Sequence, residues 1–474
     1  MPSGSGSRPI DIAFWEFLVV LVYMVLVGVV FSRKKAINIK QHPEYKYYLW
    51  GIYSKIIGGV LFSLTYVYYY DNGDTISYFR SAVPLANLAL KDPVMFFQAL
   101  FADNTPENRY LFFDQETGYP IPYVYYDSRT YWLVRLISPL VLFSFKSYLL
   151  ATAFVSTIAF GGVWSLYRTF VRYYPTLRWQ LALAILFFPS TLFWGSGIMK
   201  DTFTFTALCL YISSLDAFFF LKRDRLRAGS IGLVASALMI AMKPYIFMMI
   251  FPAGLLWAMH RRVSRIRNSL VRVLFLPMAM AALGFLVIVT LESLGDRLNK
   301  FSLDKALETI VVSQNDLKRG EQYGDNYFDL GELEPTWSSV FSKLHVATFA
   351  GLFRPTILEA KNVVVMLAAL ENAWLLVFSI TILIRSRLVH LITLIRSNPL
   401  LQMCFLFSLG YAFMIGVTTP NFGAMIRFKI ALLPLYVSAL FITDLILKRW
   451  RAASNRGLGF QFKTFVDGDP ERAT

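Results

Sequence analysis

Runs of 18 or more mostly apolar residues recur along this chain, and they restrict its fold more than any other feature. Lipid offers the backbone no hydrogen-bond partner, so such a run crosses a membrane as an α-helix. With 56% hydrophobic and 16% charged residues, the chain is too apolar for a soluble domain of 474 residues. We predict an all-α, polytopic membrane helix bundle of about 11 transmembrane helices, at roughly 14–31, 49–70, 147–167, 179–195, 202–221, 228–242, 245–260, 270–291, 362–384, 399–417 and 428–447.

Basic residues gather in alternate connections between these spans. More than half of the 46 Lys and Arg residues then lie on one side of the membrane, which the positive-inside rule makes cytoplasmic. The net charge of +16 could also fit nucleic acid, but here the charge is spread over every cytoplasmic connection rather than forming one stripe, so no nucleic-acid partner is expected. We predict an N-terminus outside and a C-terminus inside.

Two long outer loops, 71–146 and 292–361, interrupt the bundle. The first holds a helical run from Pro84 to Leu100. A short apolar piece from Tyr131 to Phe143 follows, interrupted by Arg135, and we expect interfacial helices here. The second loop is acidic. The predicted domains are an extra N-terminal span with its cytoplasmic loop (1–48), a transmembrane catalytic domain (49–447) and a cytoplasmic tail (448–474).

Ionisable residues stand at the outer end of almost every predicted span. Charges at that depth are costly unless they pair or face water, so the joint pattern favours a polar cavity that opens outward. Arg and Lys there suit a lipid-linked phosphate. Each residue alone also has a simpler reading, as a helix-start ion pair, a snorkelling Lys or a headgroup anchor. The ionisable set is Lys200, Asp201, Lys243, Arg354, Glu359 and Arg427. Asp201 and Glu359 are assigned to substrate binding, together with the neutral Asn421.

The turn from Asp71 to Asp74 is the best candidate for a catalytic carboxylate, because an acid at the mouth of a span can accept the proton of an attacking hydroxyl. A solvated loop tip or a divalent cation site are the alternatives. No other metal ligands are assigned and no cofactor is certain. Cys209 and Cys404 fall in apolar runs and read as packing residues, and the four His residues lack zinc-ligand spacing.

Aromatic residues crowd the first outer loop. Interface belts account for about half of them. The rest, mixed with carboxylates, suit a sugar, whose apolar faces stack on rings. The residues assigned to substrate binding from this set are Tyr78, Tyr126 and Trp132.

The layout of spans and outer loops, with the segment NGDTISY that contains Asp74, resembles the GT-C superfamily of membrane glycosyltransferases. Two further segments resemble bacterial polysaccharide-assembly membrane proteins: FPSTLFWGSGIMKD, which ends in Lys200 and Asp201, and NFGAMIRFK, which contains Arg427. The resemblance covers roughly 50–445. It implies a GT-C-like fold with Asp74, or else Asp71, as catalytic base. The chain departs from the pattern by an extra first span and by lacking a large C-terminal periplasmic domain, which argues against oligosaccharyl transfer to protein.

The resemblance implies an inverting glycosyltransferase at the outer face of a bacterial inner membrane, in cell-surface polysaccharide or glycolipid assembly. Its partners would be membrane lipids, a polyprenyl-phosphate-linked sugar donor and a glycan or lipid acceptor. Lys200, Lys243, Arg354 and Arg427 would hold the donor phosphate. A polymerase of lipid-linked repeats is one alternative. A transporter or flippase of a lipid-linked or anionic solute is another, although ionisable residues at mid-span depth are few, Asp216 and Glu371 being the nearest.

Overall fold

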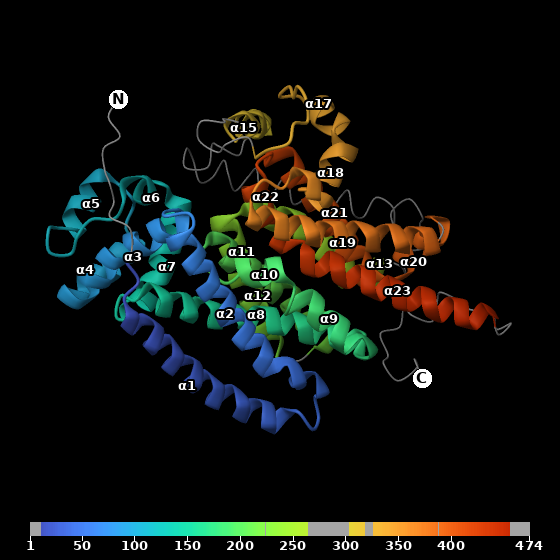
Figure 1. Cartoon of the computed structure of the whole chain (residues 1–474), viewed down its shortest axis with the longest axis horizontal. Helices are drawn as coiled ribbons and strands as arrows, with labels where there is room; N and C mark the ends of the chain where they lie inside the picture. Colours follow the sequence, from blue (N-terminus) through green and yellow to red (C-terminus); the bar gives the residue numbers. More distant parts are fainter. Residues whose placement is uncertain (1–10, 223, 264–302, 318–325, 387, 456–474) are drawn as a thin grey trace. The chain divides into compact units, whose positions relative to one another are not determined.

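The computed structural model describes residues 11–222, 224–263, 303–317, 326–386 and 388–455 (Figure 1). Within these ranges the regular structure is helical, apart from one isolated antiparallel bridge between Tyr327 and Asn421. The chain forms two compact units. Unit 1 comprises Met1–Val171, Ile185–Ser214 and Gly229–Pro244, and unit 2 comprises Arg172–Ala184, Leu215–Ala228 and Tyr245–Thr474. Each unit is described by itself, and the domain limits at residues 48 and 447 stay predictions.

Six helices in the described ranges are long and apolar enough to cross a membrane. A seventh span is formed if the helices Phe422–Ala431 and Leu433–Ala452, bent by 60°, count as one. The chain is therefore a multi-pass helical membrane protein. The six are α1 (Phe14–Asn38), α8 (Tyr148–Tyr173), α11 (Lys200–Asp216, continued to Leu221), α12 (Arg225–Met242), α19 (Val363–Ser386) and α21 (Pro399–Thr418).

The predicted number of eleven spans is not confirmed. The range 49–70 forms α2 (Tyr48–Tyr68), but its Lys55 and its many Tyr, Gly and Ser residues lower its hydropathy, and it is not among the six. The range 179–195 is broken into α9 (Arg178–Ile185) and α10 (Pro189–Trp194), because Pro189 starts a new helix. Helix α13 (Pro244–Val263) has only a short apolar stretch, and the range 270–291 lies outside the described residues.

In unit 1, the first span is attached to the start of α8 by a buried acid. Glu16 Oε2 accepts hydrogen bonds from Ser147 Oγ (2.6 Å) and from the Leu149 backbone N–H (3.3 Å). A carboxylate suits this place, because the first N–H groups of a helix have no partner within the helix. Below it, Val20 of α1 packs against Leu149 and Leu150.

The first outer loop folds into five helices, which the sequence predicted only in part. The predicted start at Pro84 was wrong, because α3 already begins at Asp74 and contains Pro84. Arg135 does not interrupt α7 but lies buried, donating to Ala102 O and to Asn104 Oδ1 (3.0 Å). The helices are α3 (Asp74–Lys91), α4 (Pro93–Phe101), α5 (Pro106–Phe112), α6 (Pro122–Tyr126) and α7 (Ser128–Phe143).

In unit 2, α18 and α21 pack with their backbones almost in contact. A Cβ atom on Gly351 would lie 2.0 Å from Ala412 O, and one on Gly416 would lie 2.0 Å from Ala347 O. Small residues four apart on both helices allow this approach, as in other membrane helix pairs. Figure 1 also shows α19, α21 and α23 running side by side. Among the described residues of unit 2, the other α-helices are α15 (Leu303–Asp316), α17 (Trp337–Ser342), α18 (Leu344–Phe353), α20 (Leu388–Ser397), α22 (Phe422–Phe428) and α23 (Leu433–Asn455).

Candidate functional site

The predicted acidic turn connects α2 to α3. Asp71 adopts a left-handed backbone (φ 56°) and is exposed, and Gly73 has φ 146°. A side chain at Gly73 would also collide with the Tyr66 ring, at 2.5 Å, so the turn requires glycine here. Asp74 is the first residue of α3 and is half-buried, where a carboxylate stabilises the helix N-terminus. The next residue, Thr75, is buried and shares a 2.9 Å hydrogen bond with Tyr148, which fixes the start of α3.

Lys200 lies beside residues that come from the first outer loop. Its Nζ donates to Thr130 Oγ1 (2.9 Å) and lies 3.8 Å from Asp127 Oδ2. It also lies 6.0 Å from the centre of the Tyr78 ring, a cation–π distance. Tyr78 follows Asp74 by four residues on α3, so both occupy the same face of the helix. Unit 1 therefore gathers Asp74, Tyr78 and Lys200 in one region, and the Lys200 side chain remains 23% exposed.

A buried ion pair adjoins this region. Asp201, the residue after Lys200, pairs with Lys243 between α12 and α13, and their side chains are only 5% and 7% exposed. The turn before Lys200 is held to α8, because Ser156 Oγ donates to Ser196 O (2.7 Å). Lys243 was predicted to bind a donor phosphate, but its ammonium donates a hydrogen bond to the Asp201 carboxylate. Buried ions need such pairing, and this pair fixes the start of α11.

Two of the predicted sugar-binding aromatics are exposed on the loop helices. Tyr126 ends α6 and packs edge-on against Tyr125, with ring centres 5.3 Å apart. The Arg135 guanidinium lies over the ring of Trp132 on α7, 5.4 Å from the ring centre. Both rings are about half exposed, so they are accessible to a ligand from solvent or lipid.

An exposed ion pair stabilises the far end of α3. Lys91 Nζ lies 2.7 Å from Asp114 Oδ2 and also contacts Glu116. The hydrogen bond from Lys91 lowers the pKa of Asp114 to about 2, and the bond to Asp114 raises the pKa of Lys91 to about 12.

The other predicted site residues lie in unit 2, where three of them meet around Phe328. The Arg354 guanidinium lies 5.1 Å from the Phe328 ring centre and pairs with Glu359 at 2.6 Å. The Phe328 backbone N–H donates to Pro420 O (3.2 Å), next to Asn421. Asn421 is buried and accepts the Ala424 backbone N–H (3.1 Å), so it caps α22.

Two of these residues have local contacts that the sequence pattern does not reveal. Glu359 Oε2 accepts the Thr356 backbone N–H (2.8 Å) and hydroxyl (2.9 Å), which forms a capping box. The Arg427 guanidinium on α22 lies 5.4 Å from the Phe428 ring centre. The predicted ligand-binding roles of Glu359 and Arg427 remain predictions.

Two fully buried lysines, Lys55 and Lys429, were not predicted as site residues. Lys429 donates to Leu352 O (3.0 Å), Arg354 O (2.5 Å) and Asn372 Oδ1 (3.1 Å), and so holds the end of α18 that precedes Pro355. Lys55 in α2 donates to Thr191 O at 3.5 Å. The sequence could have indicated a buried role for Lys55, because this lysine lies inside an apolar run. Lys429 follows Arg427 closely in the chain, so the sequence suggested a charge at the outer end of a span rather than a buried lysine.

A charge near mid-span depth would have favoured a transporter. Asp216 instead ends α11 and pairs with Arg172, and it accepts a hydrogen bond from Tyr173 OH (2.8 Å). These contacts, all within unit 2, give Asp216 a structural role at a helix end.

Among the residues that the structure describes, no three His, Cys, Asp or Glu side chains are grouped closely enough to hold a metal ion. A divalent cation bound at Asp71 and Asp74 therefore stays a prediction, as does the absence of a cofactor. Comparison with family models, with curated proteins and with solved structures gives no significant match. The resemblance to the GT-C superfamily consequently rests on the sequence motifs, and the multi-pass helical architecture is the firm result.

Proposed function

We propose that this membrane protein is an inverting glycosyltransferase that uses a polyprenyl-phosphate-linked sugar donor. The observation that supports this most is the shared location, in unit 1, of a helix-start carboxylate and a partly exposed lysine. Asp74 and Tyr78 lie on one face of α3, and Tyr78 faces Lys200. An acid to take a proton and a cation to meet a phosphate are the two groups that such a transfer needs.

In the proposed reaction, Asp74 accepts the proton of an acceptor hydroxyl. The hydroxyl oxygen forms a bond to the anomeric carbon from one face while the bond from that carbon to the phosphate oxygen breaks on the other. The polyprenyl phosphate leaves with the bonding electron pair. Lys200 stabilises the charge that grows on this leaving group, and it suits the task because it is more exposed than Lys243.

In this proposal, the buried Asp201–Lys243 pair positions Lys200 rather than contacting the phosphate. Tyr126 and Trp132 offer exposed rings for the sugar or the acceptor. The predicted phosphate-binding roles of Arg354 and Arg427, which lie in unit 2, stay predictions and are not part of this reaction. The outer face of a bacterial inner membrane is the proposed place of the reaction.

The test is transfer of radiolabelled sugar by the purified full chain in lipid nanodiscs, across a panel of polyprenyl-phosphate-linked hexoses and pentoses. Asp74→Asn is expected to lower kcat at least about 100-fold, the usual range for loss of a general base. Lys200→Met is expected to lower it as well, with partial recovery in Lys200→Arg. Glu116→Gln removes an exposed carboxylate of the same loop and serves as the control.

Full activity in both Asp74→Asn and Asp71→Asn would exclude the proposed base. Product length distinguishes the alternative enzyme, because a polymerase joins lipid-linked repeats into long chains whereas single transfer adds one sugar. Solute flux into sealed vesicles that persists in Asp74→Asn would instead favour a transporter.

A further inference from the structure

Basic side chains gather in unit 2 where α19 and α23 end. Arg385 Nη1 lies 3.5 Å from Asp444 Oδ1, and Lys448 Nζ lies 2.6 Å from Asp444 Oδ2. The Arg451 guanidinium donates to the Arg385 backbone oxygen (2.5 Å). We call these four residues the basic cluster. Its three cationic side chains are exposed, whereas its carboxylate is only 15% exposed, so the cluster presents positive charge to its surroundings.

An apolar face of α19 leads to the basic cluster. Val377, Ile380 and Ile384 follow one another at helical spacing, so they share one face, and all three are exposed. Helix α19 is long and apolar enough to cross a membrane, so this exposed face contacts acyl chains. Ile384 directly precedes Arg385, and the lipid-facing surface therefore ends where the basic cluster begins.

Trp450 indicates the depth of the basic cluster in the membrane. It directly precedes Arg451 on α23, and its ring packs against His390 of α20, with ring centres 5.0 Å apart. Tryptophan together with basic side chains at the end of a span is typical of the headgroup level of a bilayer. The phosphates of the membrane lipids lie at this level.

These surroundings indicate the chemistry of a ligand. A guanidinium binds phosphate oxygens through two parallel N–H donors, and a lysine adds a compact charge. Three cations outweigh the carboxylate of Asp444, so a phosphate is attracted. A soluble phosphate would not use the apolar face of α19. A molecule with both a phosphate and acyl chains contacts the two adjoining surfaces at once.

We propose that the basic cluster binds the headgroup phosphate of an anionic phospholipid, whose acyl chains lie along the exposed face of α19. Asp444 holds Arg385 and Lys448 in position for this contact. The proposal stands on unit 2 alone and applies to either orientation of the chain in the membrane. It is therefore independent of the transfer reaction proposed for unit 1.

The test is lipid binding to the purified full chain in detergent, measured by native mass spectrometry during titration with dioleoylphosphatidylglycerol. Dioleoylphosphatidylcholine is the matched probe, because it keeps the acyl chains and the phosphate but has no net charge. We expect the anionic lipid to bind about tenfold more tightly. Glycerol 1-phosphate has the charge without the acyl chains, and millimolar amounts are expected not to displace the lipid.

Variants then locate the site. Arg385→Gln/Arg451→Gln is expected to weaken binding of the anionic lipid about tenfold and to leave phosphatidylcholine binding unchanged. Lys222→Gln/Arg225→Gln removes the same charge from two exposed residues of another basic connection in unit 2, and is expected to bind as the parent protein does. Unchanged melting in phosphatidylcholine verifies folding, and Arg451→Gln alone, with a smaller expected loss, replaces the double variant if that variant unfolds.

Four results would overturn the proposal. The anionic lipid binds no better than phosphatidylcholine, or the variant of the basic cluster binds it as well as the parent protein. Equal losses in Lys222→Gln/Arg225→Gln would assign the attraction to the overall basic charge rather than to this cluster. Displacement by glycerol 1-phosphate would identify a site for a soluble phosphate instead of a lipid.

Discussion

The two units contain buried lysines that are stabilised in different ways. In unit 1, Lys243 pairs with the buried carboxylate of Asp201. In unit 2, Lys429 donates to two backbone carbonyls and to the amide oxygen of Asn372. The first ammonium forms a direct ion pair, whereas the second donates its hydrogen bonds to neutral oxygens and feels the Glu371 carboxylate only through a longer-range attraction.

This difference separates two uses of a buried cation. An ion pair fixes two chain positions against each other, and each charge depends on the other. A lysine on neutral acceptors satisfies carbonyls at a helix end, here those of α18, which have no partner in the helix itself. We therefore infer that the Asp201–Lys243 pair positions the candidate site in unit 1, whereas Lys429 holds α18 in place in unit 2.

The largest effect is expected from breaking the ion pair on one side only. Lys243→Met or Asp201→Asn alone should lower the free energy of unfolding by about 3–5 kcal/mol, because each removes one member of a buried ion pair and leaves the other charge buried. Denaturant titration of the purified protein in mixed micelles measures this loss.

The double variant Asp201→Asn/Lys243→Met tests the dependence of the two charges. With neither charge present, the loss should be smaller than in either single variant. Losses that simply add would show that the two residues are not coupled, and would remove the basis of the comparison.

A smaller effect is expected at Lys429. Lys429→Met leaves its three acceptors without a donor and should lower the free energy of unfolding by about 2–3 kcal/mol. Lys448→Met is the matched control, since that lysine of α23 is 67% exposed and should change little. Stability equal to the parent protein in Lys429→Met would contradict the packing role.

A substitution in the contact between α18 and α21 tests in a second way whether Lys429 holds α18 in place. Gly416→Ala places a methyl group against Ala347 O, so the two helices must separate, at a cost of about 1–3 kcal/mol. If Lys429 acts by holding α18, its removal should cost less once α18 has already been displaced. We expect the losses in Lys429→Met/Gly416→Ala to be less than additive. Additive losses would assign Lys429 a role separate from α18.

The sequence predicted the class of fold but not its number of spans. Length and hydropathy identify a helix such as α1, but they do not distinguish a straight span from α9 and α10, where Pro189 starts a second helix. The depth of a charged residue in the membrane also does not determine which residue it pairs with. Lys200 and Asp201 are neighbours in the chain, yet consecutive helix positions face different directions, so each finds its partner on a different element.

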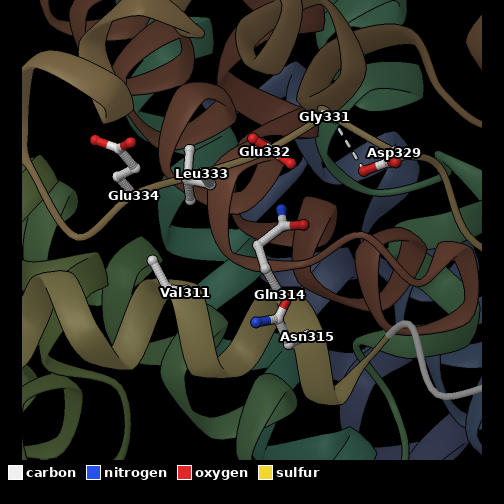
Figure 2. Close-up of a pocket in the computed structure, with 8 residues that line it drawn as sticks. All are labelled: Val311, Gln314, Asn315, Asp329, Gly331, Glu332, Leu333 and Glu334. Carbon is white, nitrogen blue, oxygen red and sulfur yellow. Dashed lines mark hydrogen bonds between the residues drawn. The ribbon is translucent and has the colours of Figure 1, made fainter.

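The close packing of α18 against α21 was not predicted, although the sequence contains a signal for it. Small residues four apart occur at Ala347 and Gly351 and at Ala412 and Gly416, the spacing that lets membrane helices approach closely. A cavity of about 430 Å³ in unit 2 had no such signal, because its lining comes from α15 and from the segment 329–334, more than ten residues further along the chain (Figure 2). Only the folded chain brings these groups together.

The smallest effect on stability is expected at the exposed pair of Lys91 and Asp114. This pair tests whether burial is the reason for the larger effects at Lys243 and Lys429. Lys91 lowers the pKa of Asp114 to about 2. A depressed carboxyl pKa stabilises the fold above the pKa of the unfolded chain, about 4, and that contribution is lost as the pH falls toward 2. The raised pKa of Lys91, about 12, stabilises below about 10 and is lost as the pH rises through 12.

Lys91→Met should therefore lower the melting temperature by a small amount between about pH 4 and pH 10, and by less outside that window. The effect should also shrink in high salt, because the pair is open to solvent. Thermal melts of the parent protein and Lys91→Met across this range measure the difference. A loss as large as that in Lys243→Met would mean that partner charge, rather than burial, determines how much these lysines contribute.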